Sequence, residues 1–204
     1  KRRRRLIGQR APELGYYIII TDTKETEKNY FKGLRRSIPS HLQRKLVVKT
    51  KRVDMGNFVD VALEEKNKNP NYAQPWIVFD RDQVPNFDQI IERAEKKGIR
   101  VGWTNPCIEI WFFGHFGEMP MFKESRQCFD KFKEVFKSKF NHEYNKADPQ
   151  IYEKLKEKGD LKQAISIAES RYRQYMRDQP QNPASAMISC GTIHQLVEEI
   201  NNKI

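Results

Sequence analysis

In the first half of the chain, short apolar runs alternate with segments whose apolar residues recur at helical spacing. Continuous, β-branched apolar runs predict buried strands, and a stripe that repeats every three to four residues predicts an amphipathic helix. We therefore expect strands over residues 16–21, 45–48, 76–79 and 99–103, and helices over residues 26–36, 58–66 and 87–97. Gly98 follows the last of these helices, in the position where a glycine commonly ends a helix.

The second half of the chain has the pattern of helices alone. Apolar stripes predict helices over residues 107–116, 125–140, 148–158, 160–177 and 187–202. Asp160 stands where an N-cap is expected, directly before a stripe that includes Leu161 and Ala164. Pro180 and Pro183 separate the last two predicted helices.

Strands that alternate with helices of this length form βαβ units around a mostly parallel sheet. The sequence therefore predicts an α/β fold, with helices flanking the sheet and a C-terminal helical extension. We expect one domain over residues 1–204, made of a basic arm (1–12), an α/β core (13–106) and the helical extension (107–204). Right-handed crossovers would bring the ends of the first and third strands to the same edge of the sheet.

Charge is concentrated at the N-terminus. The chain of 204 residues has a net charge of +11, and its first ten residues contain six basic residues and no acid. Such a block either binds phosphates as an arm or is a disordered tail, and the sequence leaves both interpretations open. The basic residues of this block are Lys1, Arg2, Arg3, Arg4, Arg5 and Arg10.

The three cysteines, Cys107, Cys128 and Cys190, form neither a zinc-binding pattern nor a disulfide framework. Their spacing favours a reducing cytoplasm. No segment approaches the ~18 consecutive apolar residues that a membrane span requires, and no signal-peptide core follows the basic start. We therefore expect a cytoplasmic protein with no membrane partner.

Asp80 and Asp82 follow the strand predicted over residues 76–79. Open α/β sheets bind their ligands at the carboxyl ends of the strands. Because the two residues are two positions apart, an extended backbone would project both carboxylates to one side. Carboxylates held close together repel, and a hard divalent cation such as Mg²⁺ relieves that repulsion. The alternative is a solvated strand end that leads into a turn at Val84 and Pro85.

Asp22 directly terminates the strand predicted over residues 16–21, so it can face the same cleft as Asp80 and Asp82. The acids that follow it, Glu25 and Glu27, are explained by an N-terminal helix turn in which Thr26 is the cap. No glycine-rich dinucleotide-binding or Walker-type motif is present, which argues against those two modes of phosphate binding.

Glu109 is the only charge among the apolar and aromatic residues that surround it. A buried carboxylate requires a partner, which is either a structural Lys or Arg or a metal site. His115 is interpreted as a core or rim residue in preference to a ligand or base. The aromatic run from Trp111 to Phe113 fits the core, with a dimer interface as the alternative.

Together, these segments resemble the RloB-like family, whose proteins are associated with prokaryotic defence loci and carry a Toprim-type fold. The resemblance covers nearly the whole chain, and the expected fold is therefore Toprim- or Rossmann-like. The matching segments are residues 22–31 (DTKETEKNYF), 78–82 (VFDRD) and 105–112 (NPCIEIWF), with looser matches at 182–183 (NP) and 193–197 (IHQLV).

The resemblance implies a metal site at the acids of the Toprim pattern, which has a Glu after the first strand and a D-x-D after the third. Carried over by residue, Asp22 takes the position of that Glu, and Asp80 and Asp82 are the D-x-D. The sequence departs from the usual Glu-Gly pair, because it has Asp22 and Thr23 there. Asp is one methylene shorter than Glu, and the loss of glycine makes the turn less permissive. Glu25 or Glu27 is the candidate to compensate for this change.

The implied activity is Mg²⁺- or Mn²⁺-dependent hydrolysis of nucleic-acid phosphodiesters, in RNA such as tRNA or in DNA, during antiphage defence. Asp22, Asp80 and Asp82 would bind the metal, and Glu109 would complete the catalytic set. Lys24, Arg81 and the arm residues Arg2, Arg3, Arg4 and Arg5 are the candidate nucleic-acid contacts. The chain is too short to contain the further domains of a topoisomerase or a primase.

Two alternatives stay open. One is a catalytically weakened Toprim-like module that binds nucleic acid or a partner protein. The other is a phosphatase or nucleotide hydrolase, which leaves the net charge of +11 unexplained. The expected partners are nucleic acid, a regulatory protein from the same defence locus and a second copy of the chain.

Overall fold

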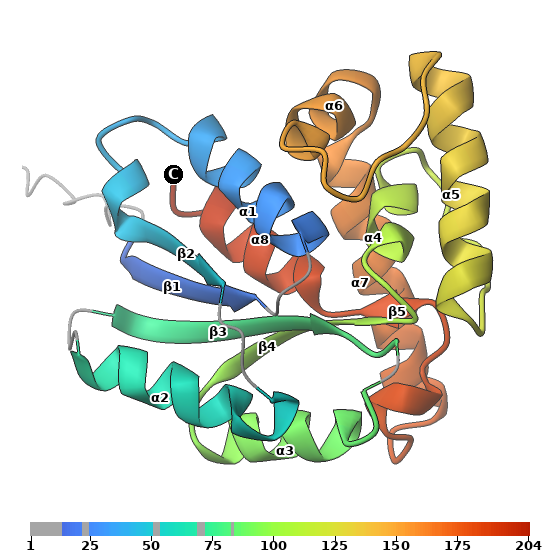
Figure 1. The fold of residues 1–204 in the computed structure, drawn as a ribbon. Helices are drawn as coiled ribbons and strands as arrows, with labels where there is room; N and C mark the ends of the chain where they lie inside the picture. The colour runs from blue at the N-terminus through green and yellow to red at the C-terminus, as the bar shows by residue number, and fades with distance from the viewer. Residues whose placement is uncertain (1–13, 22–24, 51–53, 69–71, 83) are drawn as a thin grey trace, which may run out of the picture.

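The computed structural model describes residues 14–21, 25–50, 54–68, 72–82 and 84–204 (Figure 1). Its first half alternates strands and helices, as the apolar pattern predicts. The strands are β1 (Tyr16–Thr21), β2 (Leu46–Thr50), β3 (Tyr72–Asp80) and β4 (Arg100–Asn105). The helices are α1 (Glu25–Ser37), α2 (Phe58–Lys68) and α3 (Phe87–Lys96), with short 3-10 turns at Gln43–Lys45 and Met55–Asn57. Gly98 has a φ of 68°, which confirms the glycine end predicted after α3.

The second half is mostly helical. It contains α4 (Glu109–Gly114), α5 (Ser125–Phe140), α6 (Ile151–Lys158), α7 (Leu161–Asp178), a 3-10 turn (Ala184–Ala186), β5 (Cys190–Gly191) and α8 (Ile193–Asn201). The N-cap of α7 is confirmed, because Oδ1 of Asp160 accepts hydrogen bonds from the backbone N–H groups of Lys162 (2.8 Å) and Gln163 (3.2 Å).

The predicted beginning of the last helix, at residue 187, is wrong. Residues 190–191 instead form β5, which pairs antiparallel with the end of β4. Gly191 permits this pairing, because a Cβ there would lie 2.6 Å from the carbonyl oxygen of Trp103. The Thr192 hydroxyl then accepts a hydrogen bond from the Trp103 N–H (3.1 Å), and α8 begins at the next residue.

The sheet has the strand order β2-β1-β3-β4-β5, and its first four strands are parallel. This confirms the predicted α/β fold with a mostly parallel sheet flanked by helices. In Figure 1, α2 and α3 cover one face of the sheet, and α1 and α8 cover the other. The helices α4, α5 and α6 extend the second layer beyond the carboxyl ends of the strands.

Alternate residues of each strand face these two layers. Ile18 and Ile20 of β1 belong to the apolar cluster with α2 and α3, whereas Ile19 belongs to the cluster with α1, α4 and α8. In β3, Trp76 and Val78 face the α1 side. This alternation follows from the two-residue repeat of a strand, and it determines the side of the sheet on which each strand-end residue lies.

Among the described residues, no helix is both long enough and apolar enough to cross a membrane.

Candidate active site

Asp80 is the last residue of β3 and is only 3 % exposed. It continues the row of Trp76 and Val78, and its carboxylate therefore lies on the face of the sheet that α1 and α4 cover. The hydroxyl of Thr104, the residue paired with Asp80 in β4, donates a hydrogen bond to its Oδ1. The fold thus fixes one oxygen of a buried carboxylate at the carboxyl edge of the parallel sheet.

Glu27 lies in the first turn of α1 and has no exposed surface. The sequence interpretation, in which the dipole of the helix capped by Thr26 favours Glu27, does not account for this burial. The residue occupies the same helix face as Tyr30, Phe31 and Leu34, which pack in the core. Its position brings a second carboxylate to the end of the strands.

Glu109 is the first residue of α4 and is 1 % exposed. Its Oε1 accepts a hydrogen bond from the hydroxyl of Tyr144 (3.1 Å) and lies 3.9 Å from Nζ of Lys146. Burial, followed by the Glu109 carboxylate, raises the pKa of Tyr144 well above its ordinary value, so the phenol stays a donor. Within the described part of the chain, Oε2 of Glu109 is buried and has no hydrogen-bond partner.

The loop after α5 packs against the N-terminal half of α1, beside these acids. The hydroxyl of Thr26 donates to the carbonyl oxygen of Lys146 (3.1 Å), and the side-chain amide of Asn29 donates to that of Ala147 (3.0 Å). Both contacts attach the loop to the N-terminal half of α1. The loop therefore brings Lys146 to the three acids.

Asp80, Glu27 and Glu109 line one pocket of about 320 Å³. Residues from β3, α1, α4 and the loop after α5 contribute to its wall. Its remaining lining residues are Glu25, Thr26, Ile108, Asn145, Lys146 and Ala147. The structure thus joins residues of the three main segments that the sequence singled out (22–31, 78–82 and 105–112) and adds Lys146.

The other predicted site residues are placed differently or lie outside the described residues. Asp82 is exposed, has a φ of 24° and does not line the pocket, because β3 ends at Asp80 and the strand alternation does not continue. Arg81 is half-buried and its backbone N–H donates to the carbonyl oxygen of Thr104 (2.8 Å). The residues outside the described ranges are Asp22, Lys24, Arg2, Arg3, Arg4 and Arg5, and their roles stay predictions.

The donor chemistry of the pocket fits a hard divalent cation, since carboxylate oxygens are the ligands that Mg²⁺ and Mn²⁺ prefer. The buried Oε2 of Glu109, which lacks a hydrogen-bond partner among the described residues, suits such an ion. The described residues, however, contain no group of three His, Cys, Asp or Glu side chains close enough together to hold a metal. A complete ligand set would therefore require Asp22 or a rearrangement of the three acids.

His115 is a core residue, as the sequence interpretation favoured. It is 2 % exposed, and its ring lies 5.2 Å from that of Trp111. Burial lowers the pKa of His115 to about 3. The aromatic run from Trp111 to Phe113 is likewise buried, which confirms the core interpretation. All three cysteines are buried free thiols.

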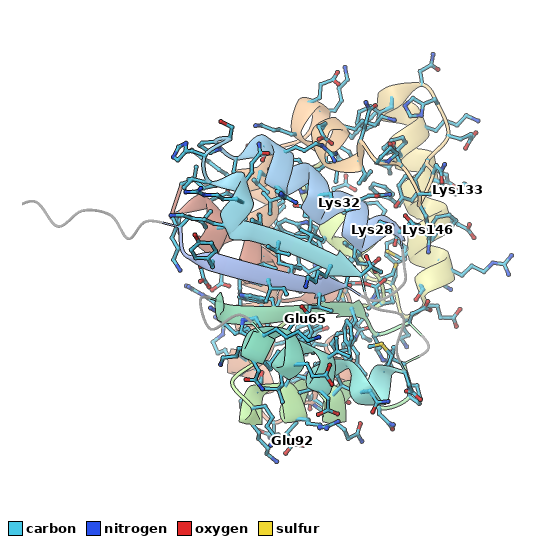
Figure 2. All side chains as sticks on the ribbon, turned by 60° about the vertical axis from the view of Figure 1, so that its left-hand side comes forward. Lys28, Lys32, Glu65, Glu92, Lys133 and Lys146 are labelled. Carbon is cyan, nitrogen blue, oxygen red and sulfur yellow. The ribbon has the colours of Figure 1, made fainter. Side chains whose placement is uncertain are left out.

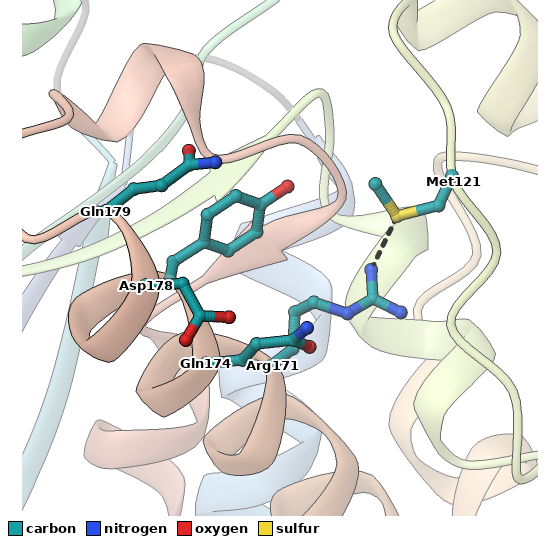
Figure 3. A pocket seen from close by; sticks show the side chains of 6 residues that line it. Met121, Arg171, Gln174, Asp178 and Gln179 are labelled. Carbon is teal, nitrogen blue, oxygen red and sulfur yellow. Dashed lines mark hydrogen bonds between the residues drawn. The ribbon is translucent and has the colours of Figure 1, made fainter.

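A second pocket, of about 280 Å³, lies beside the C-terminal half of α7 (Figure 3). Arg171 lines this pocket. Its guanidinium group donates to the carbonyl oxygens of Met119 (2.8 Å) and Ser189 (3.3 Å) and contacts the sulfur of Met121 (2.9 Å). These contacts make Arg171 a brace between α7 and two loops.

Sequence reasoning missed Tyr144 and Lys146 as site residues, and it named Glu27 only as an acid that compensates for Asp22. A signal for Glu27 was present, because it is the one charged member of the stripe formed with Tyr30, Phe31 and Leu34. No comparable pattern marks Tyr144 or Lys146. Their positions depend on how a loop distant in sequence packs against α1.

The fold and the pocket define a class of α/β proteins with acids at the carboxyl end of a mostly parallel sheet. The family model described as RloB-like protein matches residues 17–200, and the chain therefore belongs to the RloB-like family. No curated protein matches the chain. No solved structure matches it either.

Proposed function

We propose that this protein is a Mg²⁺- or Mn²⁺-dependent nuclease of the Toprim type, which hydrolyses phosphodiesters of RNA, such as tRNA, or of DNA in prokaryotic antiphage defence. The observation that carries the proposal is the joint burial of Asp80, Glu27 and Glu109 around one pocket. Three buried carboxylates repel one another, and a bound cation offsets that repulsion. The resemblance of the motifs to those of the RloB-like family supports the assignment of substrate and setting.

In this proposal, Asp80 and Glu27 would hold the metal together with the predicted ligand Asp22. Asp82, which does not line the pocket, would join them only after a rearrangement. When bound, the metal activates a water molecule and stabilises charge on the phosphoryl oxygens. Thr104 fixes the orientation of the Asp80 carboxylate through its hydrogen bond. Glu109, which Tyr144 holds in place, accepts a proton or completes the ligand set.

Lysines around the pocket supply the attraction for phosphate. Figure 2 shows Lys28 and Lys32 of α1 on the same side of the molecule as Lys146 and Lys133. Lys146 itself lines the pocket. Positive side chains beside an acidic metal site offset the charge of the nucleic-acid backbone.

The test is cleavage of end-labelled RNA, tRNA and DNA by the full chain in Mg²⁺, in Mn²⁺ and in EDTA. Asp80→Asn and Glu27→Gln are each expected to reduce metal-dependent cleavage at least about 100-fold, at or beyond the upper end of the loss for second-shell partners of a metal. Glu64→Gln is the matched control, because Glu64 is an exposed acid of α2 on the opposite face of the sheet. Cleavage that persists in EDTA or in Asp80→Asn contradicts the proposal.

Two observations favour the binding module as a second candidate. The described residues provide no ready group of three metal ligands, and Asp22 replaces the Glu of the family pattern. If no metal supports cleavage, while binding of nucleic acid weakens steeply with salt, the binding module is the correct function.

A further inference from the structure

Phe129 lies on α5 with its side chain only partly buried, next to the candidate active site. Two ammonium groups lie over its ring, with Nζ of Lys146 at 4.7 Å and Nζ of Lys133 at 5.6 Å from the ring centroid. Figure 2 shows the two lysines on the same side of the molecule. The arrangement combines an accessible aromatic ring with two cations.

The ring is connected to the pocket through two residues. Its centroid is 5.8 Å from that of Tyr144, whose hydroxyl donates to Glu109. Lys146 contributes to both places, since its Nζ lies over the ring and 3.9 Å from Oε1 of Glu109. A strand whose phosphodiester enters the pocket would therefore bring its neighbouring nucleotide to Phe129.

We propose that Phe129 stacks against an unpaired base next to the bond in the pocket, while Lys133 and Lys146 bind the adjacent phosphates. The preferred substrate is then a single strand, or an unpaired region, in place of a continuous duplex. This inference rests on the proposed function and specifies its substrate class.

The energies of the contacts favour the transfer of both lysines from the Phe129 ring to phosphates. A cation over an exposed aromatic ring contributes only about 0.5–1 kcal/mol, whereas an ammonium–phosphate contact is a stronger, charge-assisted interaction. Both lysines therefore move to phosphates when a strand binds, and the ring face becomes available. In a duplex the faces of the bases are already covered, so unstacking one of them adds a cost.

A neighbouring aromatic residue provides a matched control. Phe116 is also partly buried and has Nζ of Lys139 4.8 Å from its ring centroid, but it packs against the rings of Phe132 and Phe140. A lysine over a phenyl ring is thus a recurring surface contact in this protein. Of these two partly buried rings, Phe129 also contacts Tyr144 and Lys146, which lie against Glu109.

The test measures binding by the full chain in EDTA, with labelled single strands of about 12 nucleotides, within the range of single-strand site sizes. RNA and DNA of one sequence are compared, each alone and annealed to its complement. Phe129→Leu is expected to weaken single-strand binding about tenfold and to leave duplex binding unchanged. Phe129→Tyr and Phe116→Leu are expected to bind as the unaltered protein does. Circular dichroism and thermal unfolding verify that each variant folds.

An abasic scan separates stacking from a structural effect. Removal of one base at a single position of the strand is expected to weaken binding to the unaltered protein about tenfold. The same removal should have no effect on Phe129→Leu, because the stacking partner is already absent. The inference is overturned if Phe129→Leu loses equal affinity for single strands and for duplexes. It is also overturned if removal of the base still weakens binding to Phe129→Leu.

The failure of this inference is distinguishable from failure of the proposed function. If cleavage depends on metal and on Asp80 but Phe129→Leu binds and cleaves normally, only the stacking assignment is wrong. If the chain binds no nucleic acid in any form, both are wrong.

Discussion

The hydroxyl of Thr104 donates a hydrogen bond to Oδ1 of Asp80, and the two residues face each other in the parallel pairing of β4 with β3. Both side chains are buried, with 1 % and 3 % exposure. The bond therefore contributes to the stabilisation of a carboxylate that is buried at the end of a strand.

Thr104→Val removes this donor while keeping the shape of the side chain. The buried carboxylate loses a partner, so we expect the free energy of unfolding to fall by about 1–3 kcal/mol, measured by urea denaturation in EDTA. Thr104→Ser, which keeps the hydroxyl, should lose less. Equal stability of Thr104→Val and the unaltered protein would show that the bond contributes nothing.

The contacts of Asn105 explain why the 105–112 motif begins with an asparagine. Its buried Nδ2 donates to the carbonyl oxygens of Ala184 (3.2 Å), Ser185 (3.0 Å) and Met187 (3.0 Å). Asn105→Asp replaces these donors with a carboxylate that faces three carbonyls. We expect the free energy of unfolding, measured by chemical denaturation, to fall by at least about 3 kcal/mol. This is more than the cost of an unsatisfied neutral group. Asn86→Asp, at an exposed position, is the control and should be nearly neutral.

Gly33 allows α1 to approach α6, since a Cβ at this position would overlap Cβ of Tyr152. Helix propensity alone predicts that Gly33→Ala stabilises by about 1 kcal/mol. We expect the overlap to prevail and the substitution to destabilise by about 1–3 kcal/mol, measured as a lower thermal midpoint. Gly15→Ala, where no atom lies within 4 Å of the added Cβ, should have little effect. A stabilised Gly33→Ala would contradict the close approach.

His115 is expected to make the protein sensitive to acid. Burial lowers its pKa from 6.5 to about 3, so the unfolded chain binds a proton more readily than the folded one between these values. This contribution is fully present above about pH 6.5 and is lost as the pH falls toward 3. The loss between pH 7 and pH 5 is about 2 kcal/mol.

The measurement is the free energy of unfolding as a function of pH for the unaltered protein and for His115→Leu. The variant should show a flatter decline between pH 6.5 and pH 4. His41→Asn is the control, because the His41 side chain is exposed, and it should leave the decline in place. An equally steep decline in His115→Leu would assign the acid sensitivity to other groups.

Local sequence patterns were sufficient to predict most of the fold. The alternation of Ile18 and Ile20 with Ile19, and the stripe of Phe87, Ile90 and Ile91, each indicate an element whose burial the structure confirms. The error at residues 187–192 has a physical cause. A two-residue strand is too short for a periodic signal, and β5 forms only because β4 offers its edge.

The candidate site was predicted less completely than the fold. Asp80 and Glu109 stand out in the sequence because each is an acid beside an apolar run, and both line the pocket. Glu27 was attributed to helix capping, although its place in an apolar stripe indicated burial. The D-x-D spacing does not make Asp82 a lining residue, because the strand ends before it.

The sequence by itself determined the four parallel strands, most of the helices and the family, because hydrophobic periodicity and motif order are local properties of the chain. Only the tertiary structure decided which acids share a pocket. Thr26 and Asn29 attach the loop after α5 to α1, and this contact brings Lys146 to Glu109. Contacts between residues more than a hundred positions apart leave no periodic signal, so the surroundings of the acids follow from packing alone.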